Sequence, residues 1–199
     1  MKTSPEPADE TLMERYARGD AAAFDQLMTR HQRPLFGFIL RSVRDRAEAE
    51  DLFQEVFMKV IRAAPTWRPE AKFTTWLYTV ARNALIDRSR RRKTHTPDLS
   101  LADPVGDADG PTRLDTVASP DANPLDETLG EELRQALEAA LGALPEDQRE
   151  ALLLKRDGLT FDAIAEVTGV KANTVKSRLR YALEKLRATL HARGLKVPV

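Results

Sequence analysis

Hydrogen-bond donors and cations are concentrated near the C-terminus, between Lys171 and Tyr181. On a helix that turns by about 100° per residue, Asn173, Ser177 and Arg180 share one side. A guanidinium and short polar side chains can bond to the edges of bases, while nearby cations grip phosphates. We therefore expect this face to bind DNA through eight side chains: Lys171, Asn173, Thr174, Lys176, Ser177, Arg178, Arg180 and Tyr181.

The residues just before this face have the spacing of a helix-turn-helix. Ala165 is small where two helices must approach closely, and Gly169 allows a left-handed turn four residues later. Val175 would then seat the second helix in the core. An ordinary amphipathic helix with a solvated basic face is the alternative, but the spacing favours a helix that enters the major groove. Its expected apolar stripe is Val175, Leu179, Ala182, Leu183 and Leu186.

A second group of side chains combines aromatic rings with cations between residues 67 and 92. Rings stack on unpaired bases, and cations follow the phosphates of a single strand. A loop that begins at Pro65 could hold a base extruded from the duplex. Trp76 is better explained as a core residue, because it shares a stripe with Leu77 and Val80. The residues expected to bind nucleic acid here are Trp67, Arg68, Lys72, Trp76, Tyr78, Arg82, Asn83, Arg88, Arg90, Arg91 and Arg92.

An acidic face is predicted on the helix of residues 45–63. Asp51, Gln54, Glu55 and Met58 lie opposite its apolar stripe on a helical wheel. Acids around an exposed methionine suit docking to a basic protein surface. A solvated surface is an equally good explanation from the residues alone.

The chain offers few groups for catalysis. It contains no cysteine, which excludes disulfides, thiolate metal sites and a cysteine nucleophile. His31, His95 and His191 do not follow a glutamate by three residues, as a carboxylate di-iron site would require. A helical nucleotide hydrolase is a second alternative, but no glycine-rich phosphate loop supports it. We expect no enzyme activity, no catalytic residue, no metal and no cofactor.

Apolar residues recur at helical spacing on both sides of a Pro- and Asp-rich stretch, and no period-two pattern predicts a strand. Asp20 and Asp45 can cap helices, a break follows Ala64, and Thr74 or Thr75 can start the next helix. Thr160 can start the first helix of the helix-turn-helix. The predicted fold is all-α, with two small helical domains joined by a flexible acidic linker.

Charge is segregated along the chain although the net charge of the 199 residues is zero. Residues 1–95 hold 18 basic and 13 acidic side chains, residues 96–133 hold one and ten, and residues 134–199 hold 12 and eight. Two basic blocks around an acidic one favour a nucleic-acid binder with a tether. The predicted parts are an N-terminal tail and short helix (1–19), a first domain (20–94), a linker (95–127), a second domain (128–193) and a C-terminal tail (194–199).

The location of the protein is expected to be cytoplasmic, without membrane insertion. No apolar stretch reaches the roughly 18 residues that a spanning helix needs. The sequence MKTSPEPADE is acidic and lacks the apolar core of a signal peptide. The absence of cysteine fits a reducing compartment.

Four segments of the chain resemble the extracytoplasmic-function (ECF, group 4) sigma factors of bacterial RNA polymerase. Region two of that family is similar to three segments: DAAAFDQLMTRHQRPLFGFI, AEDLFQEVFMKVIR and FTTWLYTVARNALIDRSRRRK. Region four is similar to LPEDQREALLLKRDGLTFDAIAEVTGVKANTVKSRLRYALEKLR. Several motifs in the same order are far more specific than one helix-turn-helix.

The resemblance implies a factor that binds core polymerase and directs initiation at promoters. The face of Asp51, Gln54, Glu55 and Met58 would dock on the clamp coiled coil of the largest subunit, and region four would contact the flap. Residues 64–73 and the helix after them would open and capture the −10 element, and the helix-turn-helix would read the −35 element. The linker would enter the polymerase cleft, where its acids could imitate nucleic acid. An anti-sigma protein is a further partner that the resemblance admits. A stand-alone helix-turn-helix regulator is the alternative function.

Overall fold

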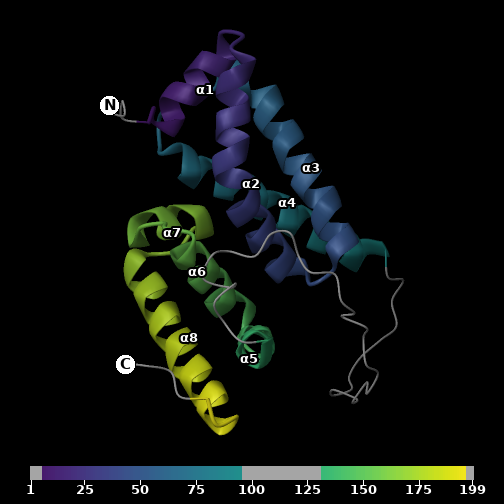
Figure 1. Ribbon diagram of the computed structural model, residues 1–199, viewed down its shortest axis with the longest axis vertical. Helices are drawn as coiled ribbons and strands as arrows, with labels where there is room; N and C mark the ends of the chain where they lie inside the picture. The colour runs from purple at the N-terminus through teal and green to yellow at the C-terminus, as the bar shows by residue number, and fades with distance from the viewer. Residues whose placement is uncertain (1–5, 96–130, 196–199) are drawn as a thin grey trace.

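The computed structural model describes residues 6–95 and 131–195, and these residues fold as helices without a strand (Figure 1). The all-α class is therefore confirmed. Most of the predicted linker lies outside the described residues. The helices are α1 (Asp9–Ala17), α2 (Ala21–Val43), α3 (Arg46–Ala63), the 3-10 turn η1 (Ala64–Thr66), α4 (Phe73–His95), α5 (Glu131–Gly142), α6 (Glu146–Arg156), α7 (Phe161–Thr168) and α8 (Ala172–Ala192).

Side-chain caps set the starts of the first long helices. The Asp20 carboxylate accepts a hydrogen bond from the Ala23 amide at 3.3 Å, and the Asp45 carboxylate accepts one from the Glu48 amide at 2.8 Å. Each bond satisfies an amide that has no partner within its own helix. Both predicted caps are confirmed.

Helix α4 starts at Phe73, one or two residues before the predicted Thr74 or Thr75. The reason is a contact from a distant element. A carboxylate oxygen of Glu10, in α1, accepts a hydrogen bond from the Phe73 amide at 2.8 Å. No local signal at residues 70–75 reveals this partner, so the prediction of the helix start was wrong.

The helix-turn-helix forms as its spacing predicts. The Thr160 hydroxyl accepts from the Ala163 amide at 3.2 Å and starts α7. Gly169 ends α7 with φ +68°, a left-handed conformation that glycine adopts without strain. Val175 is fully buried at the start of α8. Leu183 is the exception in the predicted stripe, because its side chain is 45% exposed.

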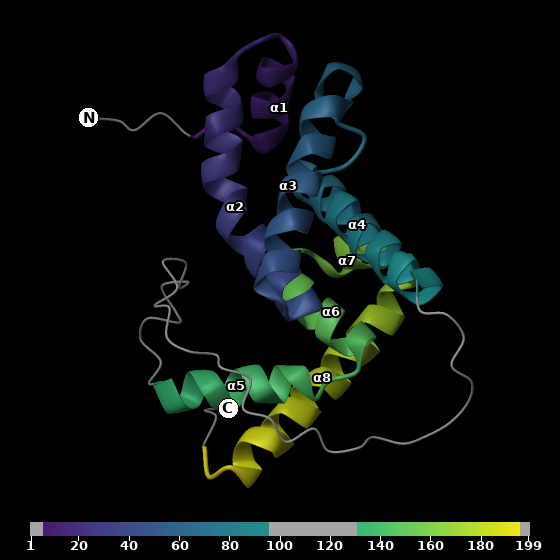
Figure 2. The ribbon, with the colours of Figure 1, turned by 90° about the vertical axis from the view of Figure 1, so that its right-hand side faces the viewer.

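One apolar core runs through helices of both predicted domains. It joins Leu35 and Phe38 of α2 and Leu77 of α4 to Leu154 of α6 and Ile164 of α7. Helix α7 packs on α4, and α6 packs on the end of α2 (Figure 1). A smaller core lies where α5 crosses α8 (Figure 2). Direct packing of the two domains was not predicted from the sequence.

Replacing Asp45 with alanine should lower the free energy of unfolding by about 1 kcal/mol, because the Glu48 amide loses its cap. Urea denaturation followed by circular dichroism measures the change. The Asp45→Asn variant keeps an oxygen acceptor and should stay near wild type. Equal losses in both variants would contradict a capping role.

Candidate nucleic-acid interfaces

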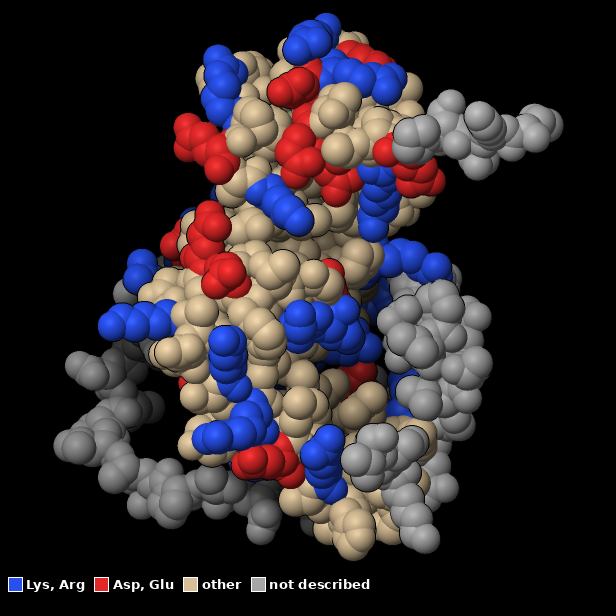
Figure 3. All heavy atoms as spheres, turned by 90° about the vertical axis from the view of Figure 1, so that its left-hand side faces the viewer, with Lys and Arg blue, Asp and Glu red and all other residues tan. Residues whose placement is uncertain are grey.

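The predicted DNA-binding face of α8 lies at the surface. Seven of its eight residues are exposed, and Lys and Arg side chains gather over the lower part of this side of the molecule, where α7 and α8 lie (Figure 3). Arg178 is the half-buried member, and its guanidinium lies 3.0 Å from the Asp147 carboxylate of α6. The arrangement leaves an exposed, largely cationic helix face immediately after the turn.

Arg180 and Tyr181 are oriented by each other. The Arg180 guanidinium lies 4.8 Å from the centre of the Tyr181 ring, and it donates a hydrogen bond to the Tyr181 hydroxyl at 3.1 Å. The ring remains 49% exposed. Stacking on an aromatic face reduces the rotamer freedom of an arginine, so less entropy is lost when the guanidinium binds a ligand.

Phe161 brings a further cation to this surface. Its ring, at the start of α7, lies between Lys176 of α8 at 5.7 Å and Lys155 of α6 at 4.8 Å. Both distances run from the ammonium nitrogen to the ring centre. Sequence reasoning missed Lys155 and Phe161, because the three residues come together only when α6, α7 and α8 pack.

The aromatic residues of the first domain pack mainly on one another. Trp67 is 8% exposed and lies 6.3 Å from Phe73 and 6.2 Å from Trp76 between ring centres. Trp76 is half-buried against the core, as the stripe with Leu77 and Val80 predicted. The cations Arg68 and Lys72 are exposed beside this cluster. The rings support the loop, and its charged side chains face solvent.

Tyr78 is buried between the two domains. Only 2% of it is exposed, and its hydroxyl donates to the Asp157 carboxylate at 2.8 Å. Burial raises the pKa of Tyr78 above its ordinary value, and the neighbouring Asp157 charge adds to the shift. Burial also raises the pKa of Asp157, and the Arg156 guanidinium opposes that shift. In this arrangement Tyr78 does not reach nucleic acid.

Arg82 is also engaged by the second domain. Its guanidinium donates to the Glu150 carboxylate of α6 at 2.8 Å, and both side chains are largely covered. Burial raises the pKa of Glu150, while the charge of Arg82 lowers it. Asn83, the next residue, is exposed. An acid of α6 therefore binds the guanidinium of Arg82, one of the residues expected from the sequence to contact nucleic acid.

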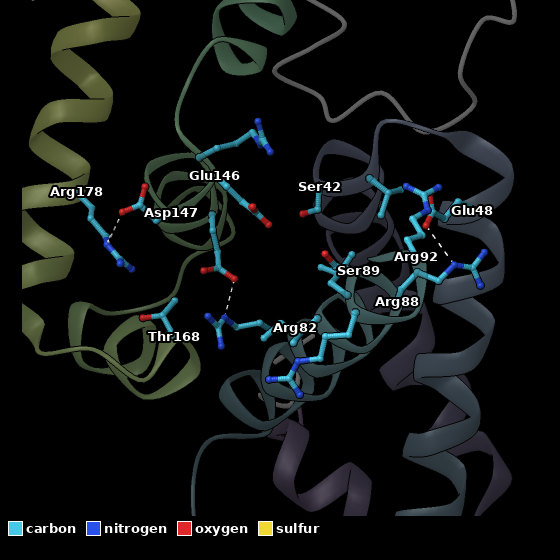
Figure 4. A pocket seen from close by; sticks show the side chains of 16 residues that line it. Ser42, Glu48, Arg82, Arg88, Ser89, Arg92, Glu146, Asp147, Thr168 and Arg178 are labelled. Carbon is cyan, nitrogen blue, oxygen red and sulfur yellow. Dashed lines mark hydrogen bonds and ion pairs between the residues drawn. The ribbon is translucent and has the colours of Figure 1, made fainter. Parts of the chain in front are cut away.

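The basic end of α4 lines a cleft of about 660 Å³ between the domains. Figure 4 shows Arg88 and Arg92 beside Glu48 on one side and Arg178 beside Asp147 on the other. Glu48 is buried and pairs with both arginines, at 3.2 Å to Arg88. The side chains of Arg90 and Arg91 are exposed.

The predicted docking face of α3 is at the surface. Asp51 and Gln54 are exposed, Glu55 is half-buried and pairs with Lys59 at 2.8 Å, and Met58 is 46% exposed. The structure places the four residues on one face, opposite the buried stripe of Leu52, Val56 and Val60.

The chain is similar to known proteins over nearly its whole length. Family models of sigma-70 region 2 and sigma-70 region 4 match residues 27–95 and 134–186. The RNA polymerase sigma-H factor of Pseudomonas aeruginosa is 36% identical, over 89% of this chain and 91% of that protein. The ECF RNA polymerase sigma-E factor of Escherichia coli is 32% identical over 92% of this chain and 94% of its own length. The chain belongs to the ECF sigma factors.

Solved structures share the fold of this sigma factor. CnrH, in complex with the cytosolic domain of CnrY, aligns with a TM-score of 0.64 at 24% identity, over 94% of this chain and 99% of that one. The sigma factor RpoE, in complex with the anti-sigma factor NepR from Bartonella quintana, aligns with a TM-score of 0.62 at 24% identity, over 84% and 96%.

Membership of this family gives the protein its function. It is an RNA polymerase sigma factor that directs transcription initiation. Sigma factors as a family are known as non-catalytic initiation factors. Region two corresponds to α2–α4 and region four to α5–α8. Within residues 6–95 and 131–195, no helix is both long and apolar enough to span a bilayer.

Replacing Tyr78 with phenylalanine should weaken the packing of the second domain on α4, because the buried Asp157 carboxylate at the end of α6 loses a donor. The expected cost is about 1–3 kcal/mol. Because the chain has no cysteine, dyes on Gln26→Cys in α2 and Arg187→Cys in α8 report domain separation by energy transfer. Unchanged energy transfer in the Tyr78→Phe protein would contradict the expectation.

The same dye pair tests the effect of pH. Burial raises the pKa of Asp157, so the packed arrangement favours its protonated form, and the contribution of Asp157 to stability is fully present below its ordinary value of 3.8. That contribution is lost as the pH rises through the raised pKa. The Asp157→Asn variant keeps an acceptor for Tyr78 but cannot ionise, so its pH dependence should shrink to the part contributed by Glu150. A dependence as large as that of wild type would count against this account.

Proposed function

We propose that this sigma factor recognises a promoter at two separate places while it is bound to core polymerase. The observation that carries the proposal is the exposed cationic face of α8 directly after the helix-turn-helix turn. On this proposal α8 enters the major groove at the −35 element, where Lys176, Ser177, Arg180 and Tyr181 contact bases. Lys171 and Arg178 contact phosphates, and Asn173 and Thr174 flank the base-reading residues.

Region two captures the −10 element on this proposal. The exposed residues of the loop between η1 and α4 receive an unstacked base, and the buried Trp67 and Phe73 with the half-buried Trp76 form its floor. Arg68 and Lys72 hold the strand at the loop. Farther along α4 the strand would follow Arg82, Asn83 and the basic side chains Arg88, Arg90, Arg91 and Arg92.

The two domains must separate before Tyr78 and Arg82 can meet DNA. Both residues now bond to acids of the second domain, Asp157 and Glu150. Polymerase would hold the domains apart, with the acidic face of α3 on the clamp coiled coil and region four on the flap. Two weak, salt-sensitive contacts to one promoter become specific when both are tethered to one enzyme.

A masking protein is a further proposed partner. The related folds of CnrH and RpoE were solved with CnrY and with the anti-sigma factor NepR. A protein that keeps the two domains of this chain together would cover Tyr78 and Arg82. We further propose that the chain acts in the cytoplasm without enzyme activity, and that its domains span residues 20–94 and 128–193 around a linker of residues 95–127.

The decisive experiment is runoff transcription with purified core polymerase on a library of promoter fragments. We expect the protein to direct initiation at fragments that share two short elements at a fixed separation. A protein that bound one of these duplexes equally well without polymerase, and directed no start site, would instead be a stand-alone regulator.

Replacing Arg180 with alanine should reduce initiation at promoters that depend on the −35 element, since one bidentate arginine–base contact contributes about 1–3 kcal/mol of discrimination. Runoff yield on −35 variants measures this loss. The matched control is Lys185→Ala, an exposed cation on another face of α8. Equal losses in both variants would indicate a general charge effect instead of base reading.

Replacing Asp51 with arginine should weaken association with core polymerase, because it reverses an exposed charge on the α3 face. Fluorescence anisotropy of labelled sigma factor measures the affinity, which should fall at least fivefold. Asp25→Arg, on the exposed part of α2, is the control and should bind as wild type does. Wild-type affinity in Asp51→Arg would remove this face from the interface.

A further inference from the structure

Helix α1 lies outside both matched regions, yet it holds the start of α4. The Glu10 carboxylate of α1 accepts the Phe73 amide bond at 2.8 Å, across 63 residues of sequence. Phe73 is the first residue of α4, so Glu10 caps this helix from another element. A carboxylate at a helix N-terminus also interacts favourably with the helix dipole.

The capped amide is one end of the loop that we assign to −10 capture. Residues 67–72 lie between η1 and α4 and form no helix or strand of their own. The other end is held by Trp67, whose ring packs against Phe73 and Trp76. Glu10 therefore decides where the loop stops and the helix begins, a boundary that Thr74 and Thr75 would otherwise set.

The first turn of α1 is itself fixed to α2. One oxygen of Asp9 lies 2.7 Å from the His31 ring nitrogen Nε2, and the other accepts from Arg30 at 2.7 Å. The hydrogen bond to His31 lowers the pKa of Asp9, although burial opposes the shift. The His31 ring in turn lies 5.4 Å from the Phe73 ring. Asp9 and His31 thus hold Glu10 beside the amide that it caps.

We propose that α1 positions the −10 loop and that Glu10 is its positioning residue. The proposal rests on the proposed role of the loop in −10 capture. Without the cap, the first turn of α4 frays, and the exposed Arg68 and Lys72 lose a fixed separation. In the capped protein these side chains lose conformational entropy when the chain folds. Without the cap they lose it when DNA binds, so DNA binding becomes weaker. The −35 helix and the α3 docking face are not in contact with Glu10, so they keep their affinities.

Three variants test this proposal in the full-length protein. Glu10→Ala removes the acceptor, and Glu10→Gln keeps an oxygen that can accept from the Phe73 amide. Glu14→Ala, one turn farther along α1, is the matched control, because Glu14 makes only a surface pair with Arg18 at 3.7 Å. Hydrogen exchange of the peptide that contains Phe73 measures the cap directly in the protein alone.

In holoenzyme, opening of the −10 element is followed by the fluorescence of 2-aminopurine placed in that element. We expect Glu10→Ala to speed exchange at Phe73 about tenfold and to reduce opening about fivefold or more. Its association with core polymerase and its binding to −35 duplex should stay at wild-type levels. Glu10→Gln should recover most of both losses, and Glu14→Ala should show neither.

The failures of this inference and of the proposed function are distinguishable. If wild-type holoenzyme opens promoters and Glu10→Ala opens them equally fast, the positioning role is overturned while the sigma function stands. Equal losses of opening, core association and −35 binding in Glu10→Ala, without recovery in Glu10→Gln, would mean general instability and overturn it too. If wild-type holoenzyme opens no promoter, the proposed function falls and this inference falls with it.

Discussion

Helix α4 packs against helices of both domains. This packing determines which side chains of the two domains stay exposed to solvent. On one side it shares the core of region two with α2 and α3, and on another it receives α7 of region four. The contact is mostly apolar, so its stability comes chiefly from area removed from water. Tyr78 and Asp157 add a buried polar bond, which is costly to leave without a partner and so favours one arrangement of the domains.

Acids of the chain pair with several of the cations that we propose bind nucleic acid. Glu150 meets Arg82, Glu48 meets Arg88 and Arg92, and Asp147 meets Arg178. A carboxylate and a phosphate oxygen offer an arginine the same kind of acceptor, so DNA and these acids compete for one guanidinium. Glu48 lies within region two and would compete even when the domains separate. Glu150 acts only across the domain contact, so opening releases Arg82.

The exposed faces of α8 and α3 are less affected by such pairing. On α8 the contacts of Arg180 and Lys176 with rings leave their charges at the surface. On α3 the acidic face lies opposite the buried apolar residues Leu52, Val56 and Val60. Both faces stay exposed while the two domains are packed together, whereas Tyr78 and Arg82 of α4 are covered. If the proposed roles hold, the −35 and docking faces are accessible before the −10 surface of α4.

Local patterns alone determined the helix-turn-helix and the starts of α2, α3 and α7. A cap, a left-handed glycine or an apolar stripe acts within a few residues, so Asp45, Gly169 and Val175 could be interpreted without a structure. The order of several such motifs identified the family. Exposure of the predicted residues on α3 and α8 also followed from the helical wheel, apart from the half-buried Arg178 and Glu55 and the exposed Leu183.

Only the tertiary structure decided the features that join distant residues. Glu10 and Phe73 are 63 residues apart, Arg82 and Glu150 are 68 apart, and Tyr78 and Asp157 are 79 apart. Helical periodicity tells which face of α4 is apolar or charged, but it does not tell which other helix covers that face. The start of α4, the burial of Tyr78 and the pairing of Arg82 depend on such long-range packing, because each needs a partner that only the folded chain brings within hydrogen-bond distance.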